Sequence, residues 1–146
     1  MRALWPCLTF ALSNKPNTTM QTEKLPLWAK IAGYFFGIAL LFIGIRFLVL
    51  PEAAERGFGL IYNQPTYAFH FIKGIRDFFT GLLLTSFTIA NWRKPLALAV
   101  LVGSLIPVVD MLVVLNAPDA VPGTEWIHGL TAVASWIFSY FLFRKS

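Results

Sequence analysis

The sequence has little charge and almost no cysteine. Only 13% of its 146 residues are charged, whereas soluble domains carry about a quarter. Hydrophobic residues make up 57% of the chain, and one small core cannot hide so much apolar surface from water. We therefore expect lipid to be the main solvent. The single cysteine, Cys7, excludes an intrachain disulfide and a cysteine-rich metal site.

Basic residues exceed acidic ones, which gives a formal net charge of +5. In nucleic-acid-binding proteins the bases usually form a patch or stripe. Here they are spread over the chain ends and the connections. We therefore expect no nucleic-acid partner, and we interpret the bases through membrane topology.

Four apolar stretches reach or approach the length of about 20 residues that a membrane-spanning helix needs. Proline and glycine occupy the connections between them, as helix ends predict. The pattern predicts an all-α fold, an integral membrane four-helix bundle with up-down-up-down topology, over residues 28–146. The predicted helices are residues 28–50, 67–90, 96–115 and 126–143.

Residues 1–27 differ from the rest, because a short apolar start is followed by the polar stretch SNKPNTTMQTEK. Two interpretations stay open: a disordered tail, or translation that begins at Met20. A cleaved signal peptide fits less well, since Arg2 is the only early base and no clean cleavage site follows.

The second apolar run carries three charges, Lys73, Arg76 and Asp77, in the segment HFIKGIRDFF. Such charges cost roughly 9 kcal/mol on an insertion scale, whereas about ten large apolar residues return about 5 kcal/mol. The run should not insert alone. We expect partners for these charges on neighbouring helices.

Charges outside the runs favour four crossings. The N-terminal region, the turn at Arg93 and the C-terminal end would share one side with eight bases and one acid, and the other side would hold one base and four acids. Basic loops stay in the cytoplasm. We therefore predict a multipass protein of the cell membrane with both termini cytoplasmic.

Ionisable residues within the runs fall at one depth. With alternating helix directions they lie in the outer half of the membrane, about 3 to 10 Å above its midplane. Such groups mark ligand or proton-handling sites by default, although a structural ion pair explains them equally well. The ligand-binding candidates in this layer are Lys73, Arg76, Asp77, Asp110 and Arg46, and His128 lies at the same height.

The three bases Arg46, Lys73 and Arg76 outnumber the two acids of this layer. A lipophilic ligand with a carboxylate, phosphate or sulfate head would balance the excess. The alternative is that Arg46 or Lys73 reaches the phosphate of a membrane lipid, which would make lipids the partner.

His128 is the candidate catalytic acid–base, because histidine titrates near neutral pH. Its alternative role is to cap the start of its helix, and no nucleophile accompanies it. A metal site of His70, Asp77, Asp110 and His128 is disfavoured, since the first two lie about 10 Å apart along the helix axis. We predict no metal and no cofactor.

Gly33, Gly37 and Gly44 share a narrow face of the first run. Small residues allow close helix packing, whereas Arg46 points nearly away from this face. Either Arg46 reaches the outer surface, or the glycine face forms a homo-oligomer with a second copy. Both interpretations stay open.

The segments KGIRD (Lys73–Asp77) and SLIPVVD (Ser104–Asp110), with IHG in the last run, resemble an uncharacterised family of small four-helix membrane proteins from bacteria and fungi, catalogued as a domain of unknown function. The likeness covers roughly residues 31–143. The layout is more loosely similar to DoxX-like proteins, some of which act as membrane subunits beside quinone-linked oxidoreductases. The resemblance implies the fold and brings no catalytic motif.

Three functions are consistent with this pattern. The first is binding or processing of a small lipophilic molecule with an anionic, carbonyl or quinone-like group, which Lys73 and Arg76 would hold. Asp77 and Asp110 would orient these bases, and His128 would move a proton. The second is a non-enzymatic accessory subunit whose polar layer only joins its helices. The third is a small proton-coupled transporter, which needs a carboxylate that is free to exchange protons.

Overall fold

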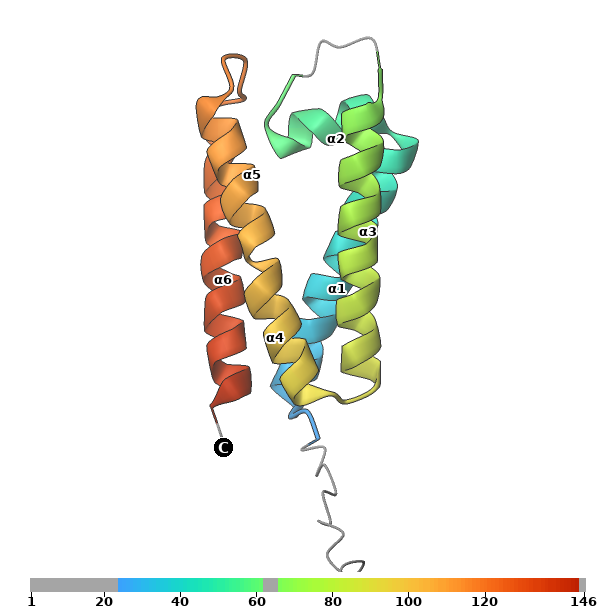
Figure 1. The fold of residues 1–146 in the computed structure, drawn as a ribbon, viewed down its shortest axis with the longest axis vertical. Helices are drawn as coiled ribbons and strands as arrows, with labels where there is room; N and C mark the ends of the chain where they lie inside the picture. Colours follow the sequence, from blue (N-terminus) through green and yellow to red (C-terminus); the bar gives the residue numbers. More distant parts are fainter. Residues whose placement is uncertain (1–23, 62–65, 145–146) are drawn as a thin grey trace, which may run out of the picture.

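The structure is a computed structural model that describes residues 24–61 and 66–144 (Figure 1). The described residues form helices and contain no strand, so the predicted all-α class is confirmed. The predictions about Met20, Cys7 and most of the N-terminal tail lie outside the described residues. The helices are α1 (Leu27–Val49), α2 (Pro51–Phe58), α3 (Ala68–Ile89), α4 (Arg93–Gly103), α5 (Leu105–Asn116) and α6 (Glu125–Phe143).

The short helix α2 was not predicted. The sequence pattern treats Pro51 as the end of the first helix, but Pro51 also occupies the first turn of α2, where its missing N–H costs nothing. α2 ends at Gly59, which has a φ of 107° and donates its N–H to the Glu55 carbonyl at 3.0 Å. A glycine favours this left-handed conformation at a helix end.

The third predicted helix, 96–115, is divided into α4 and α5 at Ser104. Pro107 explains the break, because it lacks an N–H for the Gly103 carbonyl and its ring crowds that carbonyl. The Ser104 hydroxyl donates to the Leu101 carbonyl at 2.6 Å. α4 also begins earlier than predicted, at Arg93, since Pro95 is tolerated within a first turn.

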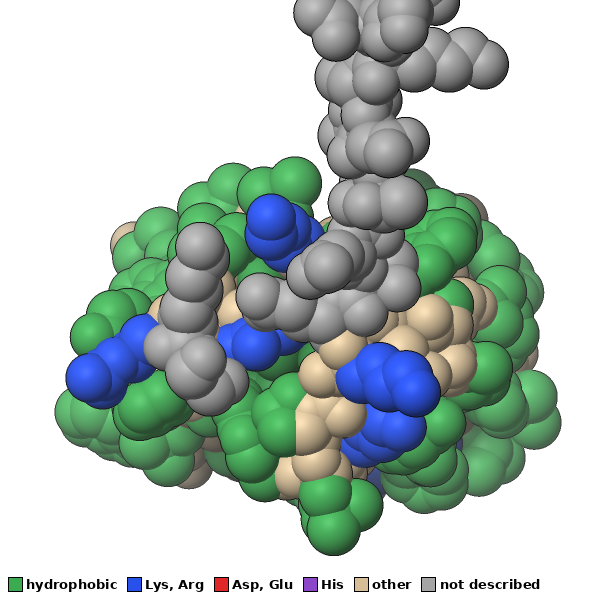
Figure 2. Space-filling view, turned by 90° about the horizontal axis from the view of Figure 1, so that it is seen from below, with side chains coloured by type: hydrophobic (Ala, Val, Ile, Leu, Met, Phe, Trp, Pro, Cys, Tyr) green, Lys and Arg blue, Asp and Glu red, His purple; other side chains and the backbone are tan. Residues whose placement is uncertain are grey.

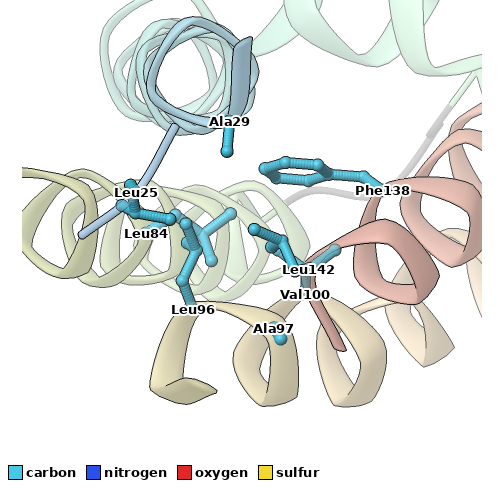
Figure 3. Packing of buried hydrophobic residues seen from close by; sticks show 8 residues of the cluster. All are labelled: Leu25, Ala29, Leu84, Leu96, Ala97, Val100, Phe138 and Leu142. Carbon is cyan, nitrogen blue, oxygen red and sulfur yellow. The ribbon is translucent and has the colours of Figure 1, made fainter. Parts of the chain in front are cut away.

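The helices form two halves, a first half of α1–α3 and a second half of α4–α6. α1 packs along α3, α2 lies against α1, and α6 packs along both α4 and α5 (Figure 1). The first and second halves meet where α3 turns into α4. A hydrophobic cluster joins them there (Figure 3), made of Leu25, Ala29, Leu84, Leu96, Ala97, Val100, Phe138 and Leu142.

The glycine face of α1 packs against α3 of the same chain. A Cβ added at Gly44 would lie 2.5 Å from the backbone nitrogen of Phe78, and one added at Gly81 would lie 2.6 Å from the carbonyl oxygen of Gly37. Gly33 similarly faces Thr88. The face considered for a second copy is therefore occupied within the chain, because α1 and α3 approach closely enough to exclude side chains.

Three helices of the described chain are long and apolar enough to cross a membrane: α1, α4 together with α5, and α6. This composition indicates a membrane protein. α3 is not among them, because every window of 18 residues along it contains Lys73, Arg76 and Asp77. A fourth crossing and the orientation of the termini stay predictions.

Candidate functional site

Four charged residues form one connected ion network between α3 and α5. Lys73 Nζ lies 2.7 Å from Asp77 Oδ2 and 3.2 Å from Asp110 Oδ2. Arg76 donates from Nε to Asp77 Oδ1 and from Nη2 to Asp110 Oδ2, both at 3.0 Å. The predicted meeting of the KGIRD charges with Asp110 is confirmed.

The ion network carries no net charge, since two bases face two acids. Lys73, Asp77 and Asp110 are buried, and Arg76 is partly exposed. The i,i+4 spacing of Lys73 and Asp77 places both on one face of α3. α3 and α5 make few other close contacts, so the ion network links the two halves where their backbones are well apart.

Lys73 has further partners from α1 and α2. Its Nζ lies 4.4 Å from the ring centroid of Phe58 and 5.1 Å from that of Phe47. Aromatic faces attract a desolvated cation. Because Lys73 already contacts two carboxylates and two rings, it is less available to a ligand than the sequence interpretation supposed.

A second buried polar pair, Glu55 with His70, was not predicted from the sequence. His70 Nε2 lies 2.8 Å from Glu55 Oε2, which joins α3 to α2. Glu55 is one of the four acids that the sequence placed in the connections on the less basic side, because α2 was not predicted. The signal was the helical spacing of Ala54 and Phe58, which are buried on the same side of α2 as Glu55.

His128 contacts the end of α2. Its Nε2 lies 2.8 Å from the Phe58 carbonyl oxygen, and the two rings have centroids 4.7 Å apart. A carbonyl oxygen only accepts, so Nε2 carries the hydrogen and Nδ1 is left as the proton-accepting atom of the neutral ring. The nearby hydroxyls of Thr131 and Ser135 donate to carbonyls of their own helix, which favours a packing role for them.

Arg46 lies outside the ion network. Its Nη2 donates to the Ala53 carbonyl at 3.0 Å, and its Cζ lies 5.9 Å from the ring centroid of Phe42. Within residues 24–61 and 66–144 it makes no ion pair. The excess positive charge that the sequence indicated therefore belongs to Arg46.

A cavity of about 310 Å³ lies between the two halves and receives side chains from every helix. Its walls are mostly apolar, and its polar groups include both His128 and Arg46. Apolar lining residues are Phe36, Leu40, Ile43, Phe47, Ala54, Phe58, Leu84, Ala99, Val100, Ile106, Pro107 and Ile127. Polar lining residues are Arg46, Lys73, Asp77, Thr80, Asp110, His128, Thr131 and Ser135.

The family model of a domain of unknown function, DUF4267, matches residues 37–142. The chain belongs to this family. All six candidate residues lie within the part that matches the DUF4267 family. No curated protein and no solved structure matches the chain, and the looser likeness to DoxX-like proteins gains no support. The family description assigns no reaction.

Proposed function

We propose that α3 is a fourth membrane-crossing helix, so that the long helices form an up-down-up-down bundle. The burial of its two faces supports this. Ile72 and Phe79 are 69% and 62% exposed, whereas Lys73 and Asp77 are 6% and 3% exposed. A helix in water shows the opposite pattern. The ion network removes the main obstacle to insertion, because it supplies the partners that an isolated α3 lacks.

The distribution of exposed charge supports cytoplasmic termini. The end of the molecule where α1 begins and α6 ends carries lysine and arginine, and the described side chains that are visible on this face in Figure 2 include no acidic one. Lys24, Lys94 and Arg144 are exposed there. Asp119 lies at the opposite end, in the connection between α5 and α6. This asymmetry is typical of a basic cytoplasmic side.

Within this bundle, the protein binds a small lipophilic molecule in the cavity between the two halves. The observation that carries the proposal is the apolar cavity of about 310 Å³ with Arg46 and His128 in its wall. Ligand sites are typically apolar cavities of about 300 to 1,000 Å³ with a few polar groups that fix orientation. The ion network has a supporting role, because it holds the two halves in register beside the cavity.

The proposal concerns binding rather than chemistry. His128 Nδ1 could accept a proton from a bound molecule, but the hydroxyls beside it donate to the backbone. An accessory subunit is the second candidate. It is favoured because the ion network carries no net charge and its members pair with one another. A proton-coupled transporter is less well supported, since Asp77 and Asp110 are both paired with bases.

A cavity-filling variant tests the proposal. Gly103 lines the cavity, and a Cβ added there meets nothing within 4 Å, so Gly103→Phe should fill the space without a backbone clash. Ala134→Phe is the control, because Ala134 is exposed on α6. Native mass spectrometry of protein released from membranes in mild detergent should show small lipophilic adducts on the wild type and on Ala134→Phe. Gly103→Phe should lose them; equal adducts on all three proteins, or none on the wild type, contradict the proposal.

A further inference from the structure

We infer that the ligand carries an anionic head, a carboxylate or a phosphate on a single lipophilic chain, and that Arg46 binds this head. The inference rests on the proposed function and narrows it to one class of ligand. The evidence is the pairing of the charged side chains in the cavity wall: some have a partner of opposite charge, and one does not.

Arg46 is the one base of the cavity wall without a carboxylate partner among the described residues. The other base, Lys73, is held by Asp77 at 2.7 Å and Asp110 at 3.2 Å. The two acids of the wall are likewise satisfied by Lys73 and Arg76. Arg76 does not line the cavity, but it pairs with both acids of the wall. With Arg76 counted, the group of three bases and two acids carries one net positive charge, and the base without a carboxylate partner is Arg46.

The acids nearest in sequence to Arg46 are engaged elsewhere. Glu55 is bound to His70 at 2.8 Å, and Glu52 accepts a hydrogen bond from the Tyr67 hydroxyl at 3.3 Å. Neither pairs with Arg46. A guanidinium that is partly removed from water without a counter-ion is costly, so an anion that enters the cavity gains from pairing with it.

The geometry of Arg46 suits a planar or branched anion. Its guanidinium has five N–H donors, and one of them is used, toward the Ala53 carbonyl. Gly57 borders the same cavity and has no side chain; a Cβ added there would lie 4.0 Å from Arg46 Nη1. Two parallel N–H donors bind a carboxylate or phosphate in a bidentate manner. A quinone or ketone oxygen would accept hydrogen bonds but leave the positive charge uncompensated.

The path of the lipophilic chain follows from the spacing on α1. Ile43, Leu40 and Phe36 line the cavity with Arg46, and steps of three and four residues place them on one helical face. Ten residues of helix separate Phe36 from Arg46, a rise of about 15 Å. An anionic head at Arg46 therefore has a continuous apolar wall for its chain.

The test uses the full chain in nanodiscs of phosphatidylcholine, which has no net charge. The probe is radiolabelled dodecanoate, competed by unlabelled dodecyl phosphate, dodecanol, decylubiquinone and dodecyltrimethylammonium. The variants are Arg46→Gln, which removes the charge, and Arg46→Lys, which keeps it. Arg56→Gln is the matched control, because Arg56 is an exposed base of α2 that does not line the cavity.

We expect saturable binding of dodecanoate to the wild type and to Arg56→Gln, and at least tenfold weaker binding to Arg46→Gln. Arg46→Lys should retain part of the affinity. Competition by dodecyl phosphate but not by dodecanol supports an anion site, and its strength relative to dodecanoate separates a phosphate head from a carboxylate head.

The outcomes also separate this inference from the proposed function. Equal competition by dodecanol or decylubiquinone, with Arg46→Gln unchanged, overturns the anionic head but leaves a lipophilic site. Binding that Gly103→Phe does not reduce, or no saturable binding of any amphiphile to the wild type, counts against the cavity itself. If Arg46→Gln unfolds, the competition series on the wild type decides alone.

Discussion

Arg76 on α3 donates to Asp110 on α5 through Nη2, with the nitrogen 3.0 Å from Oδ2. This contact joins the two halves of the molecule through charged groups, in a region where α3 and α5 otherwise make few close contacts. Charged pairs removed from water add little net stability when complete, but they are costly to break, since the remaining charge is left uncompensated. The ion network should therefore control the relative position of the two halves.

Replacing Asp110 by alanine should destabilise the protein strongly. Lys73 and Arg76 would then share one carboxylate, and loss of one partner of a buried pair costs about 3 to 5 kcal/mol. Unfolding in detergent, followed by circular dichroism, measures the change in free energy. Asp119→Ala is the control, because Asp119 is exposed and lies outside the ion network; its stability should equal that of the wild type. If Asp110→Ala is as stable as this control, the ion network has no structural role.

A double variant should lose less stability than the sum of the losses of its two single variants, Arg76→Met and Asp110→Leu. Arg76→Met combined with Asp110→Leu leaves Lys73 and Asp77 paired at 2.7 Å and replaces the other pair by apolar side chains. Such replacements are often neutral or stabilising, whereas the single changes are not. The double-mutant cycle should give a coupling free energy of at least about 1 kcal/mol. Additive effects of the two changes would mean that Arg76 and Asp110 do not act as a pair.

Gly44→Leu should separate α1 from α3. A Cβ added at this position would lie only 2.5 Å from a backbone nitrogen of α3. A larger side chain therefore forces the helices apart and costs about 1 to 3 kcal/mol or more. Gly103→Ala is the matched control, because its Cβ meets nothing within 4 Å and alanine favours a helix. Melting temperatures should fall for Gly44→Leu and stay level or rise for Gly103→Ala. A normal melting temperature for Gly44→Leu contradicts the close packing of α1 and α3.

The sequence predicted the long helices well because hydropathy and proline positions report them directly. It also predicted that Asp110 meets Lys73 and Arg76, since alternating helix directions fix the height of each residue. It did not predict α2, because eight residues of mixed polarity carry no hydropathy signal, and Glu55–His70 was lost with it.

Two further features depend on which neighbour a helix meets, which periodicity does not reveal. The glycine face of α1 was correctly recognised as a packing surface, but its partner, α3, was not. Arg93 appeared to be an exposed base of a turn, yet it is buried and donates to the Leu142 carbonyl at 2.9 Å and to the Arg144 carbonyl at 2.6 Å. It thereby satisfies carbonyls at the end of α6, where a base is favoured.

The proposed crossing of the membrane by α3 is tested most directly by labelling the two ends of this helix in intact cells. Thr66 precedes α3 and Lys94 follows it, and both are exposed. In a chain with Cys7→Ser, a cysteine at position 66 should react with a membrane-impermeant maleimide added outside. A cysteine at position 94 should react only after permeabilisation. Labelling of both positions from the same side would show that α3 does not cross, and would contradict the account of a charged layer buried inside a four-crossing bundle.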